Sequence, residues 1–226
     1  MGRAKLPRKS TNIDMTAMCD VAFLLLSFFI LATKFKPPEA LSVVTPSSVS
    51  TKMAPEKDVV QFIIDKDGKV YLSVSDANVA EKKVILETIN TSKSLGLTDA
   101  EKANFVNVPN AYIGAPFAQL KSYLDKNPAD LAHVVKPGIP AQDSTKNEVI
   151  DWIAAAKTAF SSAGKRMNIV VKGDDAAKYP SLQGIIIALK KNDEMKFQVV
   201  TSPVPVPVGT DLYKEQARLG TKGVPQ

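Results

Sequence analysis

The stretch MTAMCDVAFLLLSFFILAT, residues 15–33, decides the architecture of this chain. It contains one acidic or basic side chain, the carboxyl group of Asp20, and is otherwise predominantly apolar. At about 1.5 Å per residue, a helix of this length covers roughly 28 Å, which matches the hydrocarbon thickness of a bilayer. The stretch therefore predicts a single transmembrane helix over residues 14–33.

The charges on either side of this stretch predict its orientation. Residues 1–36 hold six Lys and Arg against two Asp, a net charge of +4, which leaves +2 of the chain's +6 for the other 190 residues. Only Lys34 and Lys36 follow the helix closely, so the positive-inside rule places the N-terminus in the cytoplasm. Most of the net positive charge thus lies in the residues that flank the apolar stretch, and no nucleic-acid partner is expected. The basic residues before the helix are Arg3, Lys5, Arg8 and Lys9.

A secretory signal peptide is the competing interpretation, with residues 21–32 as its hydrophobic region. Lys34, Phe35 and Lys36 come soon after Ala32, however, and leave no small-x-small cleavage site. Cys19 does not fit a lipoprotein cysteine, because it lies before the apolar run rather than after it. The uncleaved anchor is favoured.

Asp20 is the most informative residue of the sequence. A carboxylate inside a bilayer costs about 2.5–3.5 kcal/mol, so such groups usually face a partner helix or a water path. Thr16 lies four residues before Asp20 and Ser27 seven after it, which predicts one polar stripe. The alternative is that Asp20 lies near the interface and snorkels to the headgroups. The other faces are expected to carry Val21, Phe23, Leu25, Phe28, Phe29 and Ile30.

The segment IDMTAMCDV, residues 13–21, resembles the membrane signature of the ExbD/TolR family, which typically reads INVTPFIDV. Four positions match: Ile13, Thr16, Asp20 and Val21. Ala17 stands where the family usually has Pro, and Cys19 where it has an aliphatic residue. The resemblance implies that Asp20 carries protons and that Thr16 and Ser27 support it.

The same resemblance implies the surroundings of the chain. Family members are single-pass proteins of the bacterial inner membrane with a periplasmic C-terminal domain. The expected partners are an ExbB/TolQ-like membrane pentamer, a second copy of the chain and a TonB-like energy transducer, with peptidoglycan as a further candidate. No cofactor, metal or enzymatic activity is implied.

A second block near the C-terminus strengthens the resemblance. Residues 169–179, IVVKGDDAAKY, look like the family's strand, its Asp turn and the Tyr that opens a helix. An apolar helical pattern over residues 180–191 and a strand pattern over 196–201 follow. The family match implied by both blocks and residues 55–74 covers a little over half of the chain.

The region beyond the membrane predicts an α+β fold. Residues 58–75 read as a β-hairpin, because Asp67-Gly68 separates two alternating apolar runs. Residues 167–201 read as strand, helix and strand, with Pro180 suited to the first helical turn. The hairpin and this βαβ unit predict a small α/β domain with helices on one face of its sheet.

Between these blocks, residues 76–166 predict a helical insertion. Helices are expected over residues 81–90, 98–105, 116–126 and 144–163. Thr98 should cap the second, and Ser144 should open the fourth. The fourth should carry one apolar face made of Val149, Ile150, Ile153, Ala156, Ala159 and Phe160, with Trp152 beside it in the core.

Other candidate sites are weak. Cys19 is the only Cys and His133 the only His, which excludes an intrachain disulfide and a Cys/His zinc cluster. Asp174 and Asp175 are adjacent in a strand–helix loop, where Asp more often forms a turn than an acid/base pair. The Pro-Val repeat of residues 203–208 must be extended, as either a docking strip or a loose tail.

The sequence patterns predict five segments, and the family resemblance implies one principal function. The chain should act in a proton-motive-force-driven motor of ExbB–ExbD type that energises TonB-dependent outer-membrane transport. A TolR-like subunit for envelope integrity and a tethered periplasmic binding module are the alternatives. A strand-like patch at residues 41–44 could join a sheet or be a plain spacer. The segments are a cytoplasmic tail 1–13, a transmembrane helix 14–33, a flexible linker 34–57, a periplasmic domain 58–202 with the insertion 76–166, and a Pro-rich tail 203–226.

Overall fold

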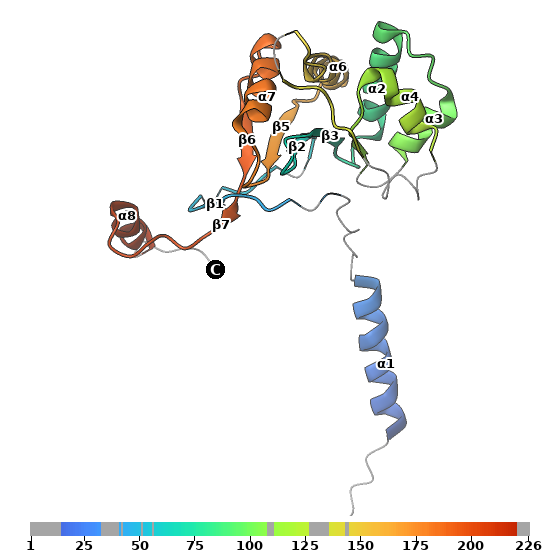
Figure 1. Ribbon diagram of the computed structural model, residues 1–226. Helices are drawn as coiled ribbons and strands as arrows, with labels where there is room; N and C mark the ends of the chain where they lie inside the picture. The colour runs from blue at the N-terminus through green and yellow to red at the C-terminus, as the bar shows by residue number, and fades with distance from the viewer. Residues whose placement is uncertain are drawn as a thin grey trace, which may run out of the picture. The chain divides into compact units, whose positions relative to one another are not determined.

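The computed structural model of the chain describes residues 15–32, 41, 43–50, 52–55, 57–107, 111–126, 136–142 and 145–220. The chain divides into two compact units, Met1–Pro38 and Glu39–Gln226. Each unit is considered by itself below. The elements are labelled in Figure 1.

The described part of the first unit is a single helix, α1 (Met15–Ala32). It is the one helix among the described residues that is long and apolar enough to cross a membrane. None of its residues is buried. The helix expected from the apolar run is confirmed, with its last described residue at Ala32.

The second unit begins its main sheet with the predicted hairpin of β2 (Val59–Ile64) and β3 (Val70–Val74). The turn is fixed by Asp65, whose carboxylate accepts hydrogen bonds from the backbone N–H groups of Asp67 (2.9 Å) and Lys69 (2.8 Å). Gly68 has a φ of +78°, a left-handed conformation that glycine adopts without steric cost. The hairpin is confirmed, and its register pairs Phe62 with Leu72.

The predicted βαβ unit is also confirmed. It consists of β5 (Asn168–Gly173), α7 (Tyr179–Lys191) and β6 (Phe197–Val200), and its strands are parallel. Pro180 lies in the first turn of α7, where its missing N–H has no intrahelical partner to lose. The complete five-stranded sheet has the order β4–β3–β2–β5–β6.

Helices cover one face of this sheet. Figure 1 shows α6 (Val149–Ser162) between α2 (Val79–Lys93) and α7, and both neighbours pack against it. Trp152 is fully buried in this core, with its ring 5.6 Å from that of Phe117, as expected for a core residue. The mixed fold with a helix-covered sheet therefore agrees with the predicted α+β class.

The insertion forms three of its expected helices close to the expected positions: α2, α3 (Asp99–Val106) and α4 (Phe117–Leu124). Thr98 caps α3 as predicted. Its hydroxyl accepts from the N–H of Glu101 at 3.3 Å, and the Glu101 carboxylate accepts from the N–H of Thr98 at 2.6 Å. This reciprocal pair is a capping box.

Two features of the insertion differ from the prediction. The insertion is not wholly helical, because β4 (Tyr112–Ile113) pairs with β3 and forms one edge of the sheet. The fourth helix, α6, begins at Val149 and not near Ser144, which lies outside the described residues. Asn147 explains the later start: its side chain donates to the carbonyl of Gly184 on α7 at 2.7 Å, and its backbone bridges to Ala141.

The described part of the linker belongs to the second unit and packs on its sheet. Leu41 and Val43 pack on Ile63, Tyr71 and Tyr112, on the sheet face opposite the helices. Residues 41, 43 and 44, the described part of the strand-like patch, form no strand. β1 (Ser47–Ser48), just after them, pairs in parallel with β7 (Ser202–Pro203). The linker therefore has partners far along the chain.

The C-terminal tail is extended only in part. Residues 204–207 lie outside any helix or strand, as the Pro-Val repeat predicts. A helix that the sequence reading missed, α8 (Asp211–Gly220), follows. The hydroxyl of Thr210 accepts from the N–H of Tyr213 at 3.2 Å, which caps its first turn.

Candidate functional site

The candidate site is a polar face on α1. In a helix of 3.6 residues per turn, Thr16, Asp20 and Ser27 fall within about 40° of one another. Asp20 lies about 6 Å along the axis from Thr16 and about 10.5 Å from Ser27. The side chains of Thr16 and Asp20 are exposed and that of Ser27 is partly exposed. The helix therefore aligns the three side chains named from the sequence.

Ser27 is already bonded within the helix. Its hydroxyl donates to the carbonyl of Leu24 at 2.9 Å. Its oxygen keeps lone pairs for a donor from outside, so Ser27 is placed to accept a hydrogen bond rather than to give one.

Phe23 corrects the expected arrangement of the helix. It lies three residues after Asp20 and four before Ser27, which places it between them on the same face rather than on an apolar face. Its side chain is 67% exposed. The three polar side chains therefore share their face of the helix with one aromatic ring.

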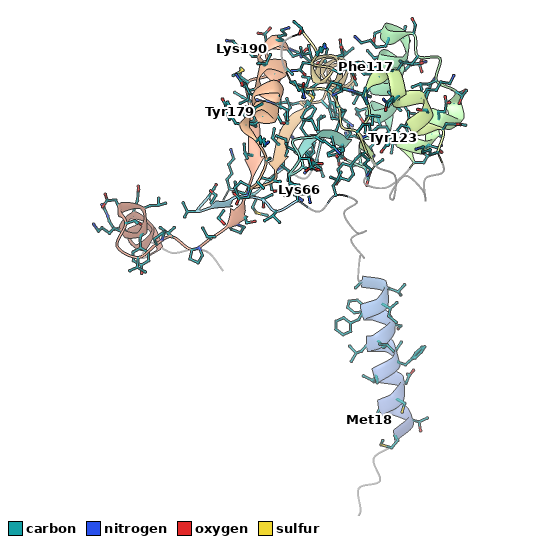
Figure 2. The ribbon with its side chains drawn as sticks, viewed as in Figure 1. Met18, Lys66, Phe117, Tyr123, Tyr179 and Lys190 are labelled. Atoms are coloured by element: carbon teal, nitrogen blue, oxygen red, sulfur yellow. The ribbon has the colours of Figure 1, made fainter. Side chains whose placement is uncertain are left out.

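Asp20 lies in a helix that has no buried residue. Every residue of α1 is at least partly exposed, and Figure 2 shows its side chains, including Met18, projecting from the helix. In a bilayer such a carboxylate needs a polar partner.

The second candidate, the Asp174–Asp175 pair, is a structural turn. The Asp174 carboxylate accepts from the N–H groups of Val44 and Ala176, both at 3.0 Å. The N–H of Asp175 donates to the carbonyl of Val44 at 2.7 Å. The pair thus fixes the linker to the start of the β5–α7 loop, and the expected turn is confirmed.

Two candidates from the sequence remain, namely His133 and a metal site. His133 lies outside the described residues. Among the residues that the structure does describe, no three His, Cys, Asp or Glu side chains gather as a metal site would require.

A buried group of charges went unnoticed in the sequence. Glu81 and Lys82 belong to a helix expected from the sequence, and both are buried. The Glu81 carboxylate accepts from Lys165 at 2.6 Å, and Lys82 donates to Asp76 at 2.6 Å. The Lys165 hydrogen bond lowers the pKa of Glu81, and the same bond raises the pKa of Lys165.

This group joins the insertion to the sheet. Glu81 belongs to α2, whereas Lys165 lies just before β5. Asn78 adds a bond to Asp58 at 2.8 Å, which reaches the start of β2. Acidic and basic residues at helical spacing gave no signal of this role, because their partners lie far away in the sequence.

Comparisons with known proteins agree with the fold and the membrane helix. The model of one protein family, described as biopolymer transport protein ExbD/TolR, matches residues 7–204. The chain is 24% identical over 109 residues to the "Biopolymer transport protein ExbD" of Aquifex aeolicus (strain VF5). That match covers 47% of this chain and 83% of the relative. No solved structure gives a significant match.

Proposed function

The chain belongs to the ExbD/TolR family, and we propose that it is a proton-carrying subunit of an inner-membrane motor in which Asp20 binds and releases the proton. Family membership implies a subunit of a motor that energises biopolymer transport. One observation carries the finer proposal: the carboxyl group of Asp20 lies in an apolar helix that is long enough to cross a membrane. None of the residues of this helix is buried.

The energies involved are of the right size for a motor. An ionised carboxylate in the membrane costs about 2.5–3.5 kcal/mol when it lacks a partner. One proton that crosses a potential of about 100 mV releases about 2.3 kcal/mol. A single proton can therefore bias Asp20 between a neutral state that tolerates an apolar contact and an ionised state that seeks polar groups.

Other subunits must supply those polar groups. We propose a ring of ExbB/TolQ-like helices around two copies of α1, because one helix cannot satisfy the carboxylate of Asp20 alone. In this arrangement the N-terminus is cytoplasmic and the second unit is periplasmic, where it passes motion to a TonB-like transducer. Service to outer-membrane transport is preferred over the TolR-like role in envelope integrity.

Replacement of Asp20 by Asn tests the proposal. Asn has nearly the same volume and can form hydrogen bonds, but it cannot exchange a proton. Asp20→Asn should leave the complex assembled and abolish energy-dependent outer-membrane uptake, or envelope integrity, at equal expression. Asp20→Glu keeps the proton and moves the carboxyl group by one methylene, so it should retain partial function at best.

Asp14 provides the matched control. Asp14→Asn is the same chemical change six residues earlier, just outside the apolar run. It should leave function unchanged. Full function of Asp20→Asn would end the motor proposal and favour a tethered binding module.

A further inference from the structure

A second site lies in the Glu39–Gln226 unit, where β5 and β6 begin. A cavity of about 850 Å³ opens there, a volume within the range of small-molecule sites. Its walls are the C-terminal end of α6, the first residues of both strands, the turn after α7 and Lys52 from the linker. Figure 1 shows β5 and β6 side by side next to α7.

The lining of this cavity is strongly basic. It contains five Lys and Arg side chains against Asp193 and Glu194. Two of the five have partners: Lys157 contacts Glu194 at 3.4 Å and the carbonyl of Asn192 at 2.6 Å, and Lys165 contacts Glu81 at 2.6 Å. Helices α6 and α7 both end here, so their negative C-terminal ends also account for Lys157.

Three cations remain: Lys52, Arg166 and Lys196. All three are exposed, and within the described residues none forms an ion pair. They come from three separate segments, namely the linker and the residues just before β5 and β6. Convergence of unpaired cations from distant segments on one cavity raises the local concentration of anions.

Apolar groups line the same cavity. Phe160 is buried, Phe197 and Met167 are half-buried, and Met195 is 56% exposed. Apolar walls beside converging charges are typical of sites that orient a ligand through its polar groups and hold its apolar part by contact.

We propose that this cavity binds a ligand with two or more negative charges, on carboxylates or phosphates, beside an apolar portion. Lys52 and Lys196 supply ammonium donors, and the guanidinium group of Arg166 can donate two parallel hydrogen bonds to one acidic group. The site is independent of Asp20, so it stands whether or not that residue carries protons.

Binding to the full chain in nanodiscs of zwitterionic lipid tests the proposal by calorimetry. The probes are the tripeptide Glu-Leu-Glu and phenyl phosphate. Both are anions with an apolar portion, but the peptide carries carboxylates and phenyl phosphate carries a phosphate group. Binding of the peptide alone would identify a carboxylate ligand, and binding of phenyl phosphate alone a phosphate ligand. Binding of both would show that charge and an apolar portion suffice. Failure of both probes to bind at millimolar concentration would overturn the proposal.

The variants separate the cavity from the general charge of the domain. Arg166→Gln with Lys196→Gln should weaken binding at least about tenfold, since each change removes a charge-assisted hydrogen bond. Lys178→Gln with Lys190→Gln removes the same charge from exposed residues outside the cavity and should change binding by less than about twofold. Equal losses in the two double variants would overturn the proposal. Each single cavity variant gives an independent reading if the double variant misfolds.

Discussion

Gly184 supports a sharp test of the fold around the βαβ unit. It is buried in the middle of α7, where a Cβ atom would overlap the carbonyl oxygen of Ala141 and lie 2.7 Å from the carbonyl carbon. The Gly184 carbonyl also accepts the hydrogen bond of the Asn147 side chain. Gly184→Ala must therefore push the 139–141 segment away from α7.

The magnitude follows from three terms. Overpacking against backbone costs about 1–3 kcal/mol, and leaving the buried Asn147 amide unpaired costs about 1–3 kcal/mol. Alanine is the better helix former by about 1 kcal/mol, which offsets part of this loss. Gly184→Ala should thus lower the free energy of unfolding by about 1–5 kcal/mol, although helix propensity alone predicts a gain. At an m-value of about 2–3 kcal/mol/M, the urea midpoint falls by about 1 M.

Trp152 provides the assay. It is the only Trp of the chain and is fully buried, so its fluorescence reports unfolding of the second unit during a urea titration of the full chain in detergent. Gly173→Ala is the control, because a Cβ there would meet no atom within 4 Å. A Gly184→Ala midpoint equal to or above that of the unmodified chain would refute the proposed close contact between α7 and residue 141.

Three further predictions concern the domain and its orientation. Thr98→Ala removes the capping box of α3 and should cost about 1 kcal/mol of unfolding free energy, measured by the same fluorescence titration; no change would contradict the cap. The lowered pKa of Glu81 means that its contribution to stability is present above its unfolded pKa and is lost as the pH falls through the folded pKa. Unfolding free energy should therefore fall below about pH 4.5, and Glu81→Gln should flatten that fall; identical acid profiles would contradict the Lys165 pairing. A reporter fused before Met15 should be cytoplasmic and one after Thr201 periplasmic, and reversed reporters would contradict the topology.

The features that the sequence predicted well are those set by local chemistry. The Asp67-Gly68 turn, the Thr98 cap and Pro180 at the start of α7 each fix a backbone conformation within a few residues. Hydrophobic periodicity did the same for α1 and for the core face of α6. In all these cases the signal and its structural consequence lie in one short segment.

The features that the sequence did not predict depend on distant partners. The start of α6 is set by Asn147 and its bond to α7, and two-residue β4 exists because β3 offers an edge to pair with. Burial of Glu81 depends on Lys165, 84 residues away. The position of Phe23 is different: helical spacing alone places it between Asp20 and Ser27, so that correction was available from the sequence.

The most direct test of the central claim is proton flux through the reconstituted complex. The chain and its ring-forming membrane partner would be placed in liposomes that hold a pH-sensitive dye, and a membrane potential would be imposed. The complex should acidify the lumen, Asp14→Asn should do so equally, and Asp20→Asn should abolish the flux while the complex stays assembled. Undiminished flux through the Asp20→Asn complex would contradict the assignment of Asp20 as the proton carrier.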